Sequence, residues 1–113
     1  MTACIFCRIA AGEASAQVEF ADDRLVVFRD LAPRAPVHLL VIPRKHVASL
    51  AEAQSEDAGL LGELLLGAAA AAARAGIADG FRVVTNTGPD AGQSVHHLHF
   101  HVLGGRRLSW PPG

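Results

Sequence analysis

Three histidines recur at every second position near the end of the chain, with apolar residues between them. The histidines are His97, His99 and His101, and the apolar residues are Leu98, Phe100 and Val102. Successive side chains of a β-strand point to opposite faces, so the pattern predicts a strand with one imidazole face and one apolar face. A helix explains less, because His99 would be turned away from the other two histidines. On a strand, the ring nitrogens can converge on one small group, either a phosphate or a metal ion.

Packing alone explains this cluster poorly, because a buried imidazole carries polar nitrogens that need partners. A catalytic zinc site with three histidine ligands is the serious alternative to a phosphate site, since His-x-His on a strand is good ligand spacing. Neutral imidazole is also a common zinc ligand and, with an ordinary pKa of about 6.5, a competent nucleophile near neutral pH.

The remaining pattern predicts the elements that hold this strand. A short helix is expected over residues 5–11, strands over 16–20, 25–29, 37–43, 81–86 and 97–103, and one long helix over 55–75. The near-continuous apolar run 37–43 predicts a central strand. The order of these elements indicates an α+β fold, an antiparallel sheet with the long helix on one face.

The long helix has recognisable end signals. Ser55 is the expected N-cap and Gly76 the expected stop after the last turn. An apolar stripe with helical spacing is predicted to pack on the sheet. Its residues are Leu60, Leu61, Leu64, Leu65 and Ala68.

Size and charge limit the function. The 113 residues fit a single domain, 1–113. A formal charge of −1 and the lack of a long basic run argue against binding a nucleic-acid polymer. The N-terminal residues lack an apolar signal core, and the apolar segment 58–75 is interrupted by Glu63 and Arg74. We therefore expect a cytoplasmic protein that does not enter the membrane.

The only two cysteines form a Cys4-x-x-Cys7 pair. Two cysteines this close do not make a disulfide framework. The pair is interpreted as half of a metal site, as a redox pair, or as incidental.

The segment from His97 to Leu103 resembles the His-φ-His-φ-His-φ-φ signature of the histidine triad (HIT) family, where φ is an apolar residue. Its flanks resemble the HINT branch of that family, the purine nucleoside phosphoramidases. These flanks are Gly92-Gln93-Ser94, Gly104-Gly105 and Trp110-Pro111-Pro112-Gly113, and further likeness lies in residues 4–8, 22–24, Asp30 and 41–46. The resemblance implies a HIT-like fold with a five-stranded antiparallel sheet, one long helix, a short N-terminal helix and a homodimer.

The resemblance also implies a reaction. His99 attacks the α-phosphorus of a purine nucleoside 5′-phosphoramidate, or of an aminoacyl adenylate, and forms a covalent nucleotidyl-histidine that water hydrolyses. His101 and Ser94 donate to the phosphate or to the leaving amine, and His97 and His38 orient the reacting groups. Neutral donors to the phosphate are expected from Asn86, Gln93 and the backbone near Gly92. No cofactor is required for this chemistry.

The nucleoside and a structural metal complete the expected site. Asp30 is expected to accept hydrogen bonds from the ribose, and an AMP-type base to lie in an apolar slot formed by Phe6, Ile9, Phe28 and Leu31. Trp110 in the C-terminal tail is expected to reach the partner subunit's site. The resemblance implies a structural zinc with four ligands, Cys4, Cys7, His46 and His97.

Two alternatives stay open at this point. One is a dinucleoside polyphosphate hydrolase of the same family. The other, from a different class, is a catalytically weak module that binds a nucleotide or zinc.

Overall fold

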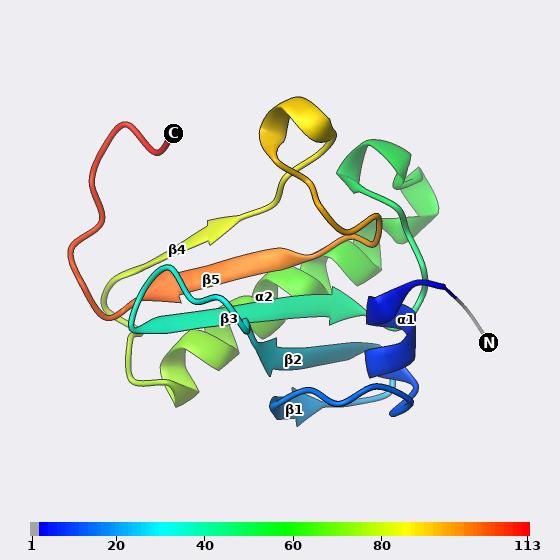
Figure 1. Ribbon diagram of the computed structural model, residues 1–113, viewed down its shortest axis with the longest axis horizontal. Helices are drawn as coiled ribbons and strands as arrows, with labels where there is room; N and C mark the ends of the chain where they lie inside the picture. Colours follow the sequence, from blue (N-terminus) through cyan, green and yellow to red (C-terminus); the bar gives the residue numbers. More distant parts are fainter. Residues whose placement is uncertain (1–2) are drawn as a thin grey trace.

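The computed structural model describes residues 3–113. Its centre is a five-stranded antiparallel sheet with the strand order β1-β2-β3-β5-β4 (Figure 1). The strands are β1 (Val18–Ala21), β2 (Leu25–Arg29), β3 (Val37–Pro43), β4 (Phe81–Val84) and β5 (Phe100–Gly104). The predicted fold class is confirmed: this is an α+β fold with an antiparallel sheet and one main helix.

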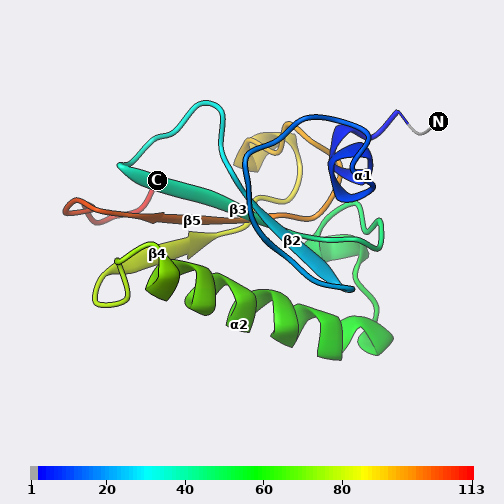
Figure 2. The ribbon, with the colours of Figure 1, turned by 90° about the horizontal axis from the view of Figure 1, so that it is seen from below.

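The two faces of the sheet are covered differently. Helix α2 (Ala58–Arg74) runs along one face, and the short helix α1 (Ile5–Ala10) lies on the other (Figure 2). Central β3 pairs with β2 on one side and β5 on the other, and residues 38–43 are buried. A strand buried on both faces needs mostly apolar side chains, which explains the apolar run at 37–43, interrupted only by His38.

The long helix begins later than predicted. Residues Ser55–Asp57 form a separate 3₁₀ turn, and Ser55 is not its cap. The Asp57 carboxylate instead accepts the Gln54 backbone N–H at 2.8 Å and pairs with Lys45 Nζ at 2.6 Å. These two bonds hold the turn before α2 starts. The helix ends at Arg74, and Gly76 follows with a positive φ of 80°, as a glycine stop requires.

The apolar stripe of α2 is narrower than predicted. Leu60, Leu64 and Ala68 are buried against the sheet, together with Ala71 and Ala72 further along the helix. Leu65 was wrongly included, because 49% of its surface is exposed. The contact line follows steps of four residues, and Leu65 lies just outside it.

The histidine strand begins three residues later than predicted. The register that pairs Val41 with Phe100 would place Leu98 opposite Pro43, which has no N–H for the ladder. The Leu98 N–H donates to the Val47 carbonyl oxygen at 2.6 Å instead. The predicted alternation of faces still holds: Leu98, Phe100 and Val102 belong to the core on the α2 side.

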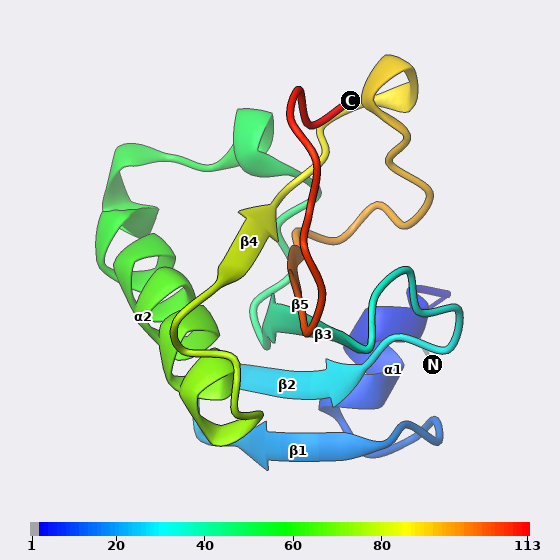
Figure 3. The same cartoon turned by 90° about the vertical axis from the view of Figure 1, so that its left-hand side faces the viewer.

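The C-terminal segment lies far from helix α1 (Figure 1). After β5 the C-terminal segment lies at the end of the molecule opposite α1 (Figures 1 and 3). The guanidinium of Arg82 on β4 donates to the Ser109 carbonyl oxygen at 3.0 Å and lies 5.8 Å from the Trp110 ring centroid. Over residues 3–113, no helix combines the length and hydropathy needed to cross a bilayer.

Candidate active site

A pocket of about 300 Å³ opens between α1, the end of β2 and the segment that leads into β5. Eight residues predicted from the sequence line it: Phe6, Ile9, Phe28, Asp30, Leu31, Ser94, His99 and His101. Ile5, Ala16, Leu40 and Val95 add apolar surface that the sequence reasoning missed. The pocket therefore combines apolar walls with a few polar groups, as small-ligand sites do.

The ring of His99 is held in one tautomer. Its Nδ1 lies 2.7 Å from the His97 carbonyl oxygen. A carbonyl only accepts hydrogen bonds, so Nδ1 carries the proton and Nε2 keeps a free lone pair. The edge of the Phe6 ring packs on this imidazole at a centroid distance of 5.1 Å and fixes its plane. His99 therefore lines the pocket with one unprotonated ring nitrogen, which is chemically able to act as a nucleophile.

A chain of hydrogen bonds sets the opposite tautomer in His101. The Arg34 backbone N–H donates to His38 Nδ1 at 3.0 Å, so His38 carries its proton on Nε2. That Nε2–H donates to His101 Nδ1 at 2.8 Å. His101 must then carry its own proton on Nε2 and acts as a hydrogen-bond donor. The centroids of the His99 and His101 rings lie 5.1 Å apart, so an acceptor and a donor nitrogen come from neighbouring rings.

The two carboxylate oxygens of Asp30 have different neighbours. Its Oδ1 accepts the Ala32 backbone N–H at 2.8 Å, which is the ordinary role of an aspartate in a turn. Its Oδ2 lies 3.3 Å from His38 Nε2 and 4.0 Å from His101 Nδ1. The carboxylate lines the pocket with lone pairs to spare.

Burial keeps the imidazoles of His38 and His101 neutral. Desolvation, with smaller contributions from the nearby His99 and His38 rings, lowers the pKa of His101 to about 4. Desolvation also lowers the pKa of His38. At neutral pH His101 is therefore an uncharged donor and not an imidazolium acid.

The lowered pKa of His101 makes stability depend on pH. His101 binds a proton at about pH 6.5 in the unfolded chain and only at about pH 4 in the folded chain. The contribution of its neutral ring to the free energy of unfolding is therefore complete above pH 6.5 and is lost as the pH falls towards 4. The full difference corresponds to about 3 kcal/mol. We expect urea unfolding at pH 7, 6, 5 and 4 to show a smaller loss of unfolding free energy in His101→Gln than in the unmodified chain. Parallel curves for the two proteins would contradict the lowered pKa.

Four further side chains meet beside α1. Cys4, Cys7, His46 and His97 bring their sulfur and nitrogen atoms within 4.8 Å of one another. Cys4 Sγ and Cys7 Sγ lie 3.4 and 3.5 Å from His97 Nδ1, and His46 Nδ1 lies 3.2 Å from Cys7 Sγ. Tetrahedral zinc, bound at about 2.1 Å to nitrogen and about 2.3 Å to sulfur, keeps its ligand atoms about 3.3 to 3.8 Å apart. The four residues therefore fit a closed metal site.

The His97 side chain faces Cys4, Cys7 and His46 and not the pocket. Its Nε2 lies 2.8 Å from the Pro43 carbonyl oxygen and so carries the proton, which leaves the Nδ1 lone pair facing the cysteines. Its side chain does not line the pocket. The three triad rings thus do not converge on one ion, and the alternative of a three-histidine catalytic zinc site fails on this geometry.

A second group, formed by Asp30, His38 and His101, also has ligand atoms close together. It is poorly suited to a metal. A metal on His38 Nε2 would move the ring proton to Nδ1, where it would face the donating Arg34 N–H. The tautomer set by the backbone favours the hydrogen-bond chain over metal binding.

Four predicted nucleotide-binding residues do not line this pocket in the described chain: Asn86, Gly92, Gln93 and Trp110. The Gln93 amide donates to the Ala48 and Val95 carbonyl oxygens and accepts the Gly88 N–H, so it braces the loop before Ser94. Gly92 has a φ of 85° and ends the 3₁₀ turn Pro89–Ala91. Trp110 is 79% exposed.

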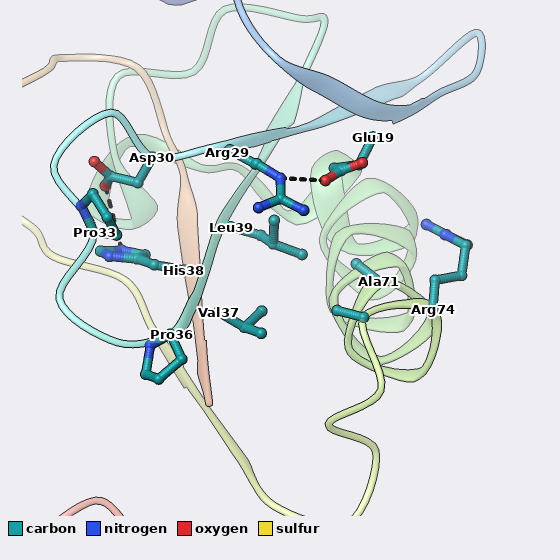
Figure 4. Close-up of a pocket in the computed structure, with 11 residues that line it drawn as sticks. Glu19, Arg29, Asp30, Pro33, Pro36, Val37, His38, Leu39, Ala71 and Arg74 are labelled. Atoms are coloured by element: carbon teal, nitrogen blue, oxygen red, sulfur yellow. Dashed lines mark hydrogen bonds and ion pairs between the residues drawn. The ribbon is translucent and has the colours of Figure 1, made fainter. Parts of the chain in front are cut away.

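Another cavity of similar volume borders Asp30 and His38 from the opposite side (Figure 4). The Arg29–Glu19 ion pair, 2.5 Å between Nε and Oε1, lies on one wall, and Asp30 faces His38 on the other. Neither His99 nor Ser94 lines it. We therefore place the chemistry in the α1-side pocket.

Together these features define a small α+β protein whose pocket holds two oriented imidazoles beside a Cys2His2 cluster. A sequence model of the HIT domain matches residues 11–108. The chain is 53% identical over 109 residues to an uncharacterized HIT-like protein of Synechococcus elongatus, covering 96% of each chain. The chain belongs to the HIT family.

Solved structures agree with this assignment. A HIT family hydrolase from Legionella pneumophila matches with a TM-score of 0.95 and 45% identity, covering 97% of this chain and 99% of that one. A HIT family hydrolase from Clostridium thermocellum matches with a TM-score of 0.93 and 38% identity, covering 96% of each.

Proposed function

We propose that this protein hydrolyses the P–N bond of purine nucleoside 5′-phosphoramidates, and the P–O bond to the carboxylate in related aminoacyl adenylates, through a nucleotidyl-histidine intermediate. The observation that carries the proposal is the tautomer of His99, whose Nδ1–H is bonded to the His97 carbonyl oxygen and whose Nε2 is left as a nucleophile in the pocket. The similarity to HIT family hydrolases supports a hydrolytic or transfer reaction.

In the first step, the Nε2 lone pair of His99 forms a bond to the α-phosphorus. The P–N bond to the leaving amine breaks, and its electron pair goes to that nitrogen. A proton reaches the amine through the Ser94 hydroxyl, which lines the pocket and is reprotonated by water. Positive charge develops on the His99 ring, and the hydrogen bond from Nδ1 to the His97 carbonyl oxygen stabilises it.

His101 stabilises the negative charge on the phosphoryl oxygens. Its Nε2–H donates to a phosphoryl oxygen, and the preset chain from the Arg34 N–H through His38 holds that proton in place. In the second step, water attacks phosphorus, the P–Nε2 bond breaks, and its electron pair returns to His99. The extra proton of the water leaves to solvent, so the cycle ends with AMP and free enzyme.

The nucleoside half of the substrate fits the rest of the pocket. The free lone pairs of Asp30 accept the ribose hydroxyls, and the base packs between Phe6, Ile9, Phe28 and Leu31. These walls offer stacking and few hydrogen bonds, so discrimination between purines is expected to be loose.

We infer that zinc occupies the Cys4, Cys7, His46 and His97 cluster as a structural ion, which would hold α1 against the sheet. Catalysis itself needs no cofactor in this scheme.

We also infer a cytoplasmic homodimer. The exposed Trp110, together with exposed Leu66 on α2, supports a partner contact.

The reaction is tested with an adenosine phosphoramidate that carries a fluorogenic amine. After metal removal, turnover at saturating substrate is expected to persist. In a separate experiment, an alkaline quench during turnover followed by peptide mapping is expected to find the nucleotidyl adduct on His99. The kcat/KM for this substrate is expected to exceed that for a diadenosine polyphosphate by at least about 10-fold. The reverse preference would favour the polyphosphate hydrolase, and binding of AMP without any turnover would favour a binding module.

A further inference from the structure

Helix α1 belongs to both the metal cluster and the nucleotide pocket. Cys4 is its N-cap and Cys7 lies within it, while Ile5, Phe6 and Ile9 of the same helix line the pocket. The helix has only six residues, too few to be stable without tertiary support. Whatever holds its cysteines therefore also holds one wall of the pocket.

A second connection runs through His97. The Nδ1 atom of this residue faces the two cysteines, and its carbonyl oxygen accepts the Nδ1–H of His99. The residue is fully buried, and its Nε2–H is tied to the Pro43 carbonyl oxygen. A ring bound at both nitrogens cannot rotate, so the backbone that orients His99 is held as well.

The Phe6 ring joins the two connections. Its centroid lies 5.9 Å from that of His97 and 5.1 Å from that of His99, edge-on to both rings. It also packs edge-on against Phe28, another residue that lines the pocket, at 5.5 Å. A shift of α1 would therefore move the nucleophile and the base slot together.

We propose that Cys4, Cys7 and His46 are positioning residues for nucleotide binding: a divalent metal on their cluster and a nucleotide in the pocket stabilise the same arrangement of α1 and residues 97–99. The inference builds on the nucleotide pocket proposed above. Two ligands that favour one state bind cooperatively, and the coupling is reciprocal. Metal removal is expected to weaken AMP binding by about 5- to 150-fold, and AMP is expected to tighten Zn²⁺ binding by the same factor.

The test measures both halves of this cycle without using activity. The dissociation constant of AMP is measured by calorimetry on zinc-loaded and metal-free protein. That of Zn²⁺ is measured by competition with a chromophoric chelator, with and without saturating AMP and with correction for Zn²⁺ bound by AMP. The proposal is supported if metal removal raises the dissociation constant of AMP by the same factor by which AMP lowers that of Zn²⁺. AMP binding that is identical in both metal states overturns it and leaves the proposed function intact, whereas no AMP binding in either state overturns the proposed function.

Variants at His46 separate positioning from general destabilisation. His46 is exposed and does not line the pocket. His46→Ala removes one ligand and is expected to weaken AMP binding as metal removal does, while His46→Cys keeps four ligands and restores it. His96→Ala, at an exposed histidine next to the cluster, is the matched control and should bind both ligands normally. If His46→Ala keeps its circular dichroism spectrum and full AMP affinity, the proposal is wrong.

An NMR readout covers the case in which the metal-free protein unfolds. The Nδ1–H of His99, bonded to the His97 carbonyl oxygen, should give a slowly exchanging imidazole proton signal in the zinc-loaded protein. In folded His46→Ala with AMP absent, that signal is expected to broaden or vanish, and His46→Cys should recover it. An unchanged signal in all three proteins would also overturn the proposal.

Discussion

Replacing His99 with alanine is expected to lower kcat for an adenosine phosphoramidate by at least about 10³-fold, with AMP affinity changed only a few-fold. The reason is that Nε2 of His99 is the nitrogen left unprotonated by the hydrogen bond to the His97 carbonyl oxygen. His101 cannot take over, because its Nδ1 is occupied by His38 and its Nε2 carries a proton. The measurement is single-turnover kinetics together with AMP calorimetry.

His96→Ala is the control for this experiment, because this histidine is exposed and lines neither the pocket nor the metal cluster. It should keep normal kcat, and the nucleotidyl adduct should disappear only in His99→Ala. A His99→Ala protein with more than about a tenth of the normal kcat would show that another group makes the bond to phosphorus.

Replacing Leu64 with alanine is expected to reduce the free energy of unfolding by about 2 to 5 kcal/mol. The Leu64 side chain is 0% exposed, in the core between α2 and the sheet. Truncation leaves a cavity that neighbours such as Val41 in β3 cannot fill without moving the central strand. Urea unfolding followed by circular dichroism measures the change.

Leu65→Ala is the matched control, with the same chemical change on the next residue of α2. Because about half of Leu65 is exposed, its truncation should cost no more than about 0.5 to 1 kcal/mol. Equal losses for the two variants would mean that the helix packs on the sheet with a different face, or that a partner subunit covers Leu65.

Much of the fold could be predicted because its signals are local. The alternation of residues 97–102 predicted that the apolar side chains share one face, which the structure places on the α2 side. The apolar run 37–43 marked the central strand with its observed bounds. Both signals depend only on backbone periodicity and burial. The start of β5 was mispredicted because it depends on the register with Pro43, a residue more than fifty positions away.

The helix start was mispredicted for a similar reason. Ser55 is a good local N-cap, but Asp57 is buried and bonded to Lys45, which lies just after β3. That long-range ion pair shifts the first regular turn to Ala58. Gln93 likewise looked like a phosphate donor until its three hydrogen bonds to the neighbouring loops were visible.

By itself, the sequence determined which histidines share one face of the late strand and which family the chain resembles, because residue type and spacing along one strand are local properties. Only the tertiary structure decided what each imidazole does. The proton position in His97, His99 and His101 depends on a backbone carbonyl or a second histidine, and these partners come from β3 and from the bend before β5. Three chemically identical rings therefore differ in which nitrogen carries the proton, because each one meets a different hydrogen-bond partner.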